Sequence, residues 1–303
     1  MKLRAKRPDL TDEAPREVRP TEAAGTDAAS FGFGARRSIW ERVPAWLSIP
    51  FFVLVLVFIW QVLVWLELWS EFVLPPPLEV ADQTWTVVKD MATGGPVLDS
   101  FWITAQEVLL GFLLAAVAGI GLGILVAETA FGRIVVMPFL VGINAAPKVA
   151  FAPIFVAWLG FGISAKVALA AFIAFFPLLI DTAAGLASVD VDRSKLFRSI
   201  RAPRWQTFMR LKLPSALPFI FAGLKTAAVL AVVGAVVGEF LGGGAGLGES
   251  IKIAGSQLAI DRVFAYVIVL SIAGYLFYAL IAQLERRVVF WRSADVGGVP
   301  PTA

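Results

Sequence analysis

The sequence predicts an all-α membrane protein with about six transmembrane helices. Hydrophobic residues make up 58% of the 303 residues and charged residues only 16%, whereas about a quarter of a soluble domain is charged. The mean hydropathy is +0.80, and apolar runs long enough to cross a bilayer, about 20 residues each, recur along the chain. They predict spans at residues 45–66, 105–127, 134–159, 164–186, 216–241 and 263–284.

The composition also excludes several classes of function. The chain has neither histidine nor cysteine, so it offers no imidazole base, no thiolate ligand and no HExxH or Ser-His arrangement. We therefore expect no catalytic residue and no metal site. We also expect the lipid bilayer, and no nucleic acid, among its partners.

The ends of the chain differ from its middle. Residues 1–44 are polar and mixed in charge, cannot bury a core, and predict a disordered cytoplasmic tail. The first apolar run begins too late and is too long for a signal peptide. The sequence thus predicts a transmembrane domain at residues 45–290 between this tail and a short C-terminal tail at residues 291–303.

The distribution of lysine and arginine predicts the orientation. Nine of these residues lie in the N-terminal tail, seven in the loop between the fourth and fifth spans, and one after the first span. Basic residues favour the cytoplasmic side of a membrane. We therefore expect both termini and the basic loop in the cytoplasm.

The second span contains three closely spaced glycines, Gly119, Gly121 and Gly123. Small residues let membrane helices approach one another closely. We expect these glycines, with Gly111, to form one face that packs against another helix rather than to bind a ligand.

The third span is interrupted by three prolines, and the most polar part of it, Asn144 to Lys148, includes Pro147. Broken backbone inside a bilayer is tolerated where protein or a water-filled cavity satisfies the freed polar groups. An ionisable residue at that depth suggests function, although a lysine can also extend to the interface. Asn144, Pro147 and Lys148 are therefore our first candidates for lining a pathway.

Among the ionisable residues of the fourth and fifth spans are Asp181, Lys225 and Glu239. Lys225 is expected to pair with Asp181 in a structural role. Glu239, near the end of the fifth span, either binds substrate or caps the loop that follows it. Lys225 and Glu239 complete the candidate pathway set.

The segment GGAGLGES, residues 243–250, has the spacing of a phosphate-binding loop. That motif needs a lysine, which here is Glu249, and a preceding strand. We therefore predict no ATP site in this chain, and a flexible turn followed by a short helix at residues 250–257.

The basic loop at residues 187–214 has an internal order of its own. Its first helix, expected at residues 196–200, is stopped by Pro203, which lacks an N–H and restricts the residue before it. A second helix is expected at residues 205–213. Pro214 and Pro218 are expected to end it and to start the fifth span.

Two stretches of this region, RWQTFMRLKLPSALPFIFAGL and VVGEFLGGGAGLG, resemble permease subunits of bacterial ABC importers, in the branch of nitrate, sulfonate and taurine systems and precursor-scavenging relatives. That family's loop reads Glu-Ala-Ala, three residues, Gly, nine residues, Ile, one residue, Leu-Pro. Leu213-Pro214 matches its end, whereas Lys195-Leu196-Phe197 replaces Glu-Ala-Ala and Arg201 replaces the glycine. Either the receiving groove is unusually acidic or the bend uses a different backbone geometry, because glycine most easily takes positive φ.

The resemblance implies a type I ABC importer permease architecture in a bacterial inner membrane. It implies three partners: a second copy of the chain, a cytoplasmic ABC ATPase and a periplasmic binding protein. The chain itself would hold no cofactor, since ATP and Mg²⁺ are bound by the ATPase. The residues implied in coupling to the ATPase are Lys195, Leu196, Phe197, Arg198, Arg201, Ala202, Pro203, Arg204, Trp205, Gln206, Leu213 and Pro214.

Alternatives follow from the residues alone. A secondary transporter or channel would use a relay of intramembrane acids or histidines, and a membrane enzyme would need facing catalytic groups. A basic loop can also merely fix topology or touch anionic lipid. The solute stays open: Lys148 and Lys225 suit an anion, whereas Asn144 and the aromatic residues suit a neutral heterocycle.

Overall fold

The computed structural model describes residues 45–67, 69–70 and 73–291. The chain divides into two units, residues 1–56 and 57–303. In the first unit the described part is the beginning of α2 (Ala45–Trp65), an apolar helix of 21 residues that contains Pro50. The tails expected at residues 1–44 and from residue 292 onward lie outside the described residues.

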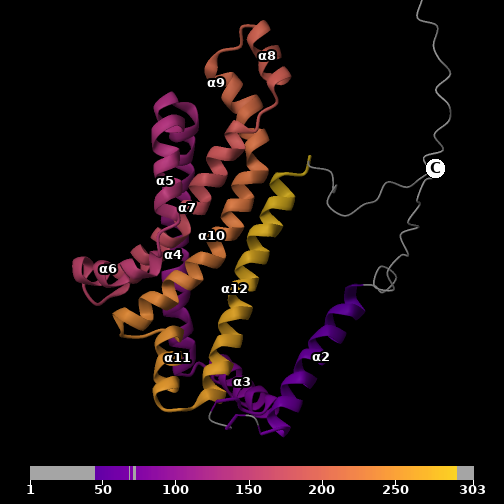
Figure 1. Ribbon diagram of the computed structural model, residues 1–303, viewed down its shortest axis with the longest axis vertical. Coiled ribbons are helices and arrows are strands. Elements are labelled where there is room, and N and C mark those ends of the chain that lie inside the picture. Colours follow the sequence, from indigo (N-terminus) through magenta and orange to yellow (C-terminus); the bar gives the residue numbers. More distant parts are fainter. Residues whose placement is uncertain (1–44, 68, 71–72, 292–303) are drawn as a thin grey trace, which may run out of the picture. The chain divides into compact units, whose positions relative to one another are not determined.

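The elements described in the second unit are helical (Figure 1). After α2 they are α3 (Pro77–Ala92), α4 (Pro96–Glu128), η1 (Gly132–Val136), α5 (Met137–Asn144), η2 (Lys148–Phe151), α6 (Ala152–Leu159), α7 (Ile163–Ala187), α8 (Val191–Ser199), α9 (Arg204–Thr207), η3 (Phe208–Lys212), α10 (Leu213–Gly242), α11 (Leu247–Ser256) and α12 (Ile260–Val288).

Among the described residues, five helices are long and apolar enough to cross a membrane. A sixth crossing exists if the two segments Gly132–Asn144 and Lys148–Leu159, which meet at an angle of 88°, count as one. Most of these helices extend past the apolar runs seen in the sequence. α4, for example, begins at Pro96, where the Asp90 carboxylate accepts a hydrogen bond from the N–H of Val97 at 2.9 Å.

The core of the second unit is built around α7, which packs against both α4 and α10. The packing depends on small residues: a Cβ added at Gly234 of α10 would lie 2.6 Å from Cα of Ala170 in α7. The glycine face expected on α4 is formed by Gly119 and Gly123 together with Gly111. Gly121 is not part of it, because a Cβ there would meet nothing within 4 Å; at 3.6 residues per turn it points away from its neighbours' face.

A second cluster joins α3, α11 and α12. Val87 of α3, Leu247 at the start of α11, and Ala265 and Val269 of α12 are buried together. At the end of α2 that belongs to this unit, the Trp60 ring lies 5.3 Å from the ring of Phe264, and its indole N–H donates to a backbone carbonyl.

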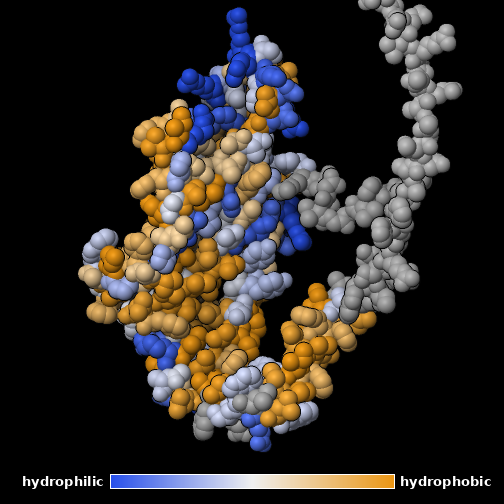
Figure 2. Space-filling view, viewed as in Figure 1, coloured by the Kyte–Doolittle hydropathy of each residue, from blue (hydrophilic) through white to orange (hydrophobic). Residues whose placement is uncertain are grey.

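The two ends of the second unit differ in character. The pair α8 and α9 stands beyond α7 and α10 at one end, and α3 and α11 lie at the other (Figure 1). In Figure 2, hydrophilic side chains gather over the α8–α9 end, and hydrophobic side chains cover the long helices next to it. The polar end therefore projects beyond the apolar part of the unit.

Candidate functional site

The basic hairpin, defined here as residues 188–212, is a short helix, a bend and a second helix. Asp190 caps α8: its carboxylate accepts hydrogen bonds from the N–H groups of Asp192 and Arg193 at 2.7 and 3.0 Å. These bonds, the one from Arg193 first, lower the pKa of Asp190 below its ordinary value. The carboxylate also lies at the positive end of the helix dipole, so α8 begins at a favourable capping residue.

The bend after α8 is a Schellman motif with an arginine at the left-handed position. The N–H of Ala202 donates to the carbonyl of Phe197 and the N–H of Arg201 to that of Arg198, both at 3.0 Å. Arg201 has a φ of +51°. The interpretation that this chain bends with a different backbone geometry is therefore wrong, because Arg201 adopts the positive φ that glycine would take most easily.

The second half of the basic hairpin continues directly into the membrane helix. The expectation that Pro214 and Pro218 end a helix is wrong, because α9, η3 and α10 run without a break from Arg204 to Gly242. The reason is the π-turn at η3, where the N–H of Leu213 donates to the carbonyl of Phe208, five residues earlier. The wider turn accommodates the missing N–H and the ring of Pro214.

The base of the basic hairpin is fixed to the helix bundle. Lys212 forms an ion pair with Glu128 at the end of α4, with Nζ 2.8 Å from Oε1. Leu211 is buried, and Phe208 and Leu213 pack on an apolar cluster formed by α4, α7 and α10. A force on the basic hairpin is therefore transmitted to three long helices.

The far part of the basic hairpin exposes both apolar and cationic side chains. Leu196, Ile200 and Trp205 are 59%, 64% and 68% exposed. Lys195 pairs with Asp192 of its own helix at 2.9 Å, but among the described residues no carboxylate pairs with the exposed guanidinium groups of Arg198, Arg201 and Arg204. Exposed aromatic and aliphatic side chains beside unpaired cations are typical of a protein-binding surface.

Ile200 was absent from the residues implied in coupling. Its spacing of four from Leu196 places both on one side of a helix, and this spacing was the signal available in the sequence.

The polar residues of the third span meet at the break between α5 and η2. Lys148 donates a hydrogen bond to Oδ1 of Asn144 at 2.7 Å, and its Nζ lies 5.5 Å from the centre of the Phe176 ring. No carboxylate among the described residues forms an ion pair with Lys148. Asn144, Pro147 and Lys148 therefore lie together at a helix break, with one half-buried cation that lacks an ionic partner.

The expected pairing of Lys225 with Asp181 is wrong. Lys225 of α10 forms its ion pair with Glu285 of α12, with Nζ 2.6 Å from Oε2. Asp181 instead lies against Gly223, where an added Cβ would be 3.1 Å from Cβ of Asp181. Positions two apart point to different sides of a helix, so α10 faces α7 through Gly223 and α12 through Lys225.

Glu239 belongs to a group of buried polar residues, which we call the buried polar cluster. It comprises Thr104 and Glu107 of α4, Lys166 of α7 and Glu239 of α10, which are all at most 4% exposed. Thr104 donates to Glu239 at 2.6 Å, and Lys166 lies 3.1 Å from Glu107. Glu239 also accepts a hydrogen bond from the N–H of Gly248, and so caps the start of α11.

The candidate residues thus fall into separate places. Asn144, Pro147 and Lys148 share the helix break, whereas Lys225 and Glu239 each have partners of their own. Sequence reasoning missed Thr104, Glu107 and Lys166. The signal available in the sequence was two ionisable residues, Glu107 and Lys166, inside the predicted second and fourth spans and close to their starts.

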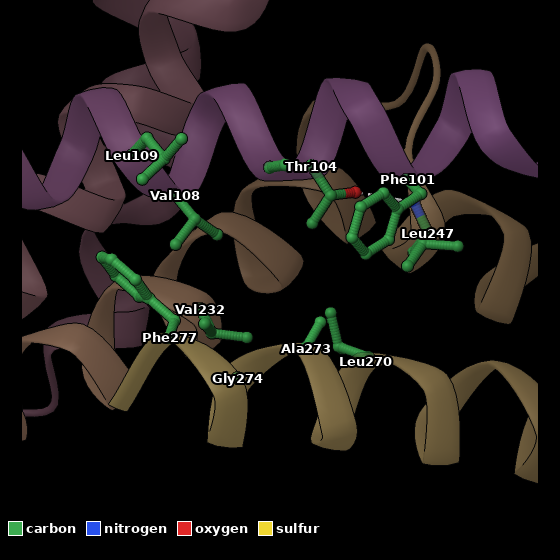
Figure 3. Close-up of a pocket in the computed structure, with 11 residues that line it drawn as sticks. Phe101, Thr104, Val108, Leu109, Val232, Leu247, Leu270, Ala273, Gly274 and Phe277 are labelled. Carbon is green, nitrogen blue, oxygen red and sulfur yellow. Dashed lines mark hydrogen bonds between the residues drawn. The ribbon is translucent and has the colours of Figure 1, made fainter. Parts of the chain in front are cut away.

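The described residues contain no group of three or more acidic side chains, histidines or cysteines that could hold a metal ion. An apolar cavity of about 150 Å³ lies between α4, α10 and α12, beside Thr104 and Leu247 (Figure 3). Its lining carries no charged side chain.

The long apolar helices define a membrane-embedded helix bundle with a basic hairpin at one end. The chain belongs to the family of binding-protein-dependent transport system inner membrane components, whose profile matches residues 119–290, more than half of its length. It is therefore a permease subunit of a binding-protein-dependent ABC importer, a multi-pass protein of the inner membrane and a transport component rather than an enzyme. The family implies a separate ATPase and a binding protein.

The relatives carry names of chemically different solutes. The chain is 34% identical to the formylaminopyrimidine transport permease ThiX of Halalkalibacterium halodurans, over 80% of this chain and 94% of the relative. It is 30% identical to the putative aliphatic sulfonates transport permease SsuC of Bacillus subtilis, over 91% and 99%. The riboflavin permease RibX of Chloroflexus aurantiacus is 33% identical over 82% and 91%.

A solved structure shares the fold. A chain of the methionine ABC transporter MetNI, in an inward-facing conformation, superposes with a TM-score of 0.51 at 18% identity. The superposition covers 63% of this chain and 95% of the other. This likeness bears on the fold alone.

Proposed function

We propose that this permease docks its ATPase through the basic hairpin, and that ATP-driven movement of the hairpin opens and closes a pathway for a small solute. The observation that carries the proposal is that the hairpin has an exposed far part and a base fixed to the helix bundle. Its far part exposes Leu196, Ile200 and Trp205 beside unpaired arginines, and its base is fixed to α4, α7 and α10. Such a surface suits an acidic groove with apolar pockets.

The charge of the hairpin supports an acidic partner surface. Arg198, Arg201 and Arg204 are exposed. In the far part of the described hairpin the one ion pair joins Asp192 to Lys195, so these three arginines keep their positive charge unpaired. Complementary charge across an interface raises the rate of association and selects the partner. ATP and Mg²⁺ would be bound by that partner ATPase.

The pathway is proposed to pass the helix break at Lys148. A cation at membrane depth without a carboxylate partner is costly to bury, and such a residue is a candidate for function. Asn144 accepts a hydrogen bond from the Lys148 ammonium group at 2.7 Å and so holds it in place. Two copies of the chain would enclose the pathway, as a homodimer. Because Lys225 is neutralised by Glu285, Lys148 is the pathway candidate that would act on a solute's charge.

The orientation proposed is cytoplasmic for both termini and for the basic hairpin. The many lysines and arginines of the N-terminal tail and the hairpin support it. Docking of a cytoplasmic ATPase on the hairpin requires the same orientation.

The test is uptake into proteoliposomes from which one component at a time is omitted. With permease, ATPase, binding protein and internal ATP all present, solute should accumulate; omission of the ATPase or of the binding protein should abolish accumulation. Uptake that persists without ATPase would contradict the proposal and support a secondary transporter or channel.

A further inference from the structure

The glycine loop, residues 243–246 between α10 and α11, passes close to an anion that belongs to the chain itself. The Glu239 carboxylate accepts hydrogen bonds from the N–H of Gly248 and the hydroxyl of Thr104. A Cβ added at Gly246 or Gly248 would fall onto that carboxylate. The glycines at positions 246 and 248 of this segment are thus explained by close approach of an internal carboxylate.

Two more bonds tie the segment to other helices. The N–H of Leu247 donates to the Thr104 hydroxyl at 2.8 Å, an interaction drawn in Figure 3. Lys166 of α7 donates to the carbonyl of Ala245 at 3.0 Å, and Glu107 holds its ammonium group from α4. Side chains of three long helices therefore fix one short loop, so the expectation of a flexible turn at this position is wrong.

Such an arrangement is costly to build in a membrane protein. Burying charges requires well-placed partners, and an apolar core of the same volume is often at least as stable. Buried charge networks are therefore candidates for a role in selecting between conformations. The location of the buried polar cluster supports such a role, since it lies toward the end of the unit opposite to the basic hairpin (Figure 1).

The connection between the two ends is one helix. α9, η3 and α10 form an unbroken segment from Arg204 in the basic hairpin to Gly242, three residues after Glu239. A helix transmits axial displacement because its backbone hydrogen bonds run along its length. A shift of the basic hairpin along this axis can therefore reach Glu239.

Space for a movement exists beside the loop. The apolar cavity of about 150 Å³ borders Thr104 and Leu247, with Phe101 beside them and Leu270 of α12 across from them (Figure 3). Protein interiors are otherwise close-packed and move between discrete arrangements rather than deforming continuously. The side chain of Leu247 can thus shift into this cavity when its backbone is released.

We propose that Thr104, Lys166 and Glu239 form a latch that couples movement of α10 to closure of the pathway at the end opposite to the basic hairpin. The proposal rests on the function proposed above. Thr104 and Lys166 act as positioning residues: they hold the glycine loop while Glu239 is in place, and release it when α10 moves.

The first experiment measures the latch itself, by amide hydrogen exchange of residues 243–250 in the assembled transporter. Thr104→Val removes the hydroxyl that accepts from Leu247 and donates to Glu239, at nearly unchanged volume. We expect exchange at Leu247 and Gly248 to become about tenfold faster in this variant. Thr104→Ser retains the hydroxyl and should restore slow exchange. Equal exchange in wild type and Thr104→Val would overturn the proposal.

The second experiment measures coupling in the same proteoliposomes. In the wild type, the binding protein should stimulate ATP hydrolysis; in Thr104→Val, the stimulation should fall about tenfold toward the unstimulated rate, and uptake should fall with it. Thr104→Ser should recover both. Faster amide exchange at Leu247 and Gly248 together with unchanged stimulation of ATP hydrolysis would show that the buried polar cluster has only a structural role, and would contradict the proposed latch. Failure of the proposed function would show differently, as a wild type without ATP-dependent uptake.

Discussion

Arg201 occupies the left-handed backbone conformation at a helix end, with a φ of +51°. For a residue with a Cβ this conformation costs on the order of 1–2 kcal/mol, part of which the two hydrogen bonds of the Schellman motif offset. The side chain contributes an exposed cation at the same position. Backbone strain and charge are therefore two separable properties of this residue.

Replacing Arg201 by glycine should relieve that strain. We expect Arg201→Gly to raise the free energy of unfolding of the hairpin by about 0.5–1 kcal/mol, the strain relief less the entropy cost of glycine. Thermal unfolding in detergent, together with amide exchange of residues 195–203, measures the change. Arg201→Ala is the control, since it removes the charge and keeps the strain; if it stabilises the hairpin as much as glycine does, backbone strain is not the cause.

The Asp190 cap makes the stability of α8 depend on pH in the acid range. Its folded pKa is lowered by the N–H groups of Arg193 and Asp192, so its stabilisation is fully present above the unfolded pKa of about 3.9 and is lost as the pH falls through the folded value. Asp190→Ala should reduce amide protection of α8 at neutral pH, and the difference from wild type should shrink below about pH 4.

Asp190→Asn is the matched control for the cap. Its side-chain oxygen still accepts from the backbone, but it does not titrate in this range. Protection of α8 in this variant should stay constant across the acid range. Equal acid sensitivity of the Asp190→Asn variant and the wild-type protein would assign the effect to another group.

At the scale of helices, packing depends on which glycine faces a neighbour. A Cβ at Gly123 would lie 2.7 Å from Cβ of Thr182, whereas a Cβ at Gly121 would meet nothing within 4 Å. Gly123→Ala should destabilise the bundle by about 1–3 kcal/mol through overpacking. Gly121→Ala, in the same helix, should be neutral or stabilise it by up to about 1 kcal/mol.

The midpoint of thermal unfolding in detergent compares these two variants. Equal destabilisation by both would mean that α4 does not present its Gly123 face to α7.

Five of the six predicted spans each correspond to one long helix, because long apolar runs need no tertiary information, whereas the third, residues 134–159, is divided into two segments that meet at 88°. The backbone geometry at Pro214 and the partners of the polar side chains could not be predicted. Pro214 was interpreted as a helix end because a proline lacks a donor, but the π-turn at Phe208–Lys212 accommodates it. Lys225 pairs with Glu285, 60 positions away, and Thr104 pairs with Glu239, 135 positions away. Only the packing of the helices decides such partners.

The candidate site divides in the same way. The basic hairpin could be predicted, since its charge, its proline and the Leu213-Pro214 pair are local features of the sequence. The φ of Arg201 could not be predicted, because a chain with arginine in place of the family's glycine can either keep a bend of positive φ or adopt another backbone geometry. The buried polar cluster escaped notice because Glu107 and Lys166 lie next to the predicted starts of spans, where charged residues are ordinary.

At the scale of the whole molecule, α10 connects the two ends of the helix bundle. The basic hairpin is fixed to the bundle by Lys212 and Glu128, and the same continuous helix carries Glu239 at its far end. In the proposed mechanism, movement of an ATPase docked on the basic hairpin acts on the glycine loop through this helix. This coupling depends first of all on binding of the ATPase at the basic hairpin.

The measurement that tests this binding most directly is the affinity of the ATPase for permease variants in nanodiscs. Arg198→Glu and Arg204→Glu each reverse an exposed, unpaired charge of the hairpin and should weaken binding about tenfold or more, with a smaller difference at high salt. Arg262→Glu, an equal reversal at the exposed start of α12, should leave the affinity unchanged. Unchanged affinity in both hairpin variants, or an equal loss in Arg262→Glu, would contradict docking at the basic hairpin.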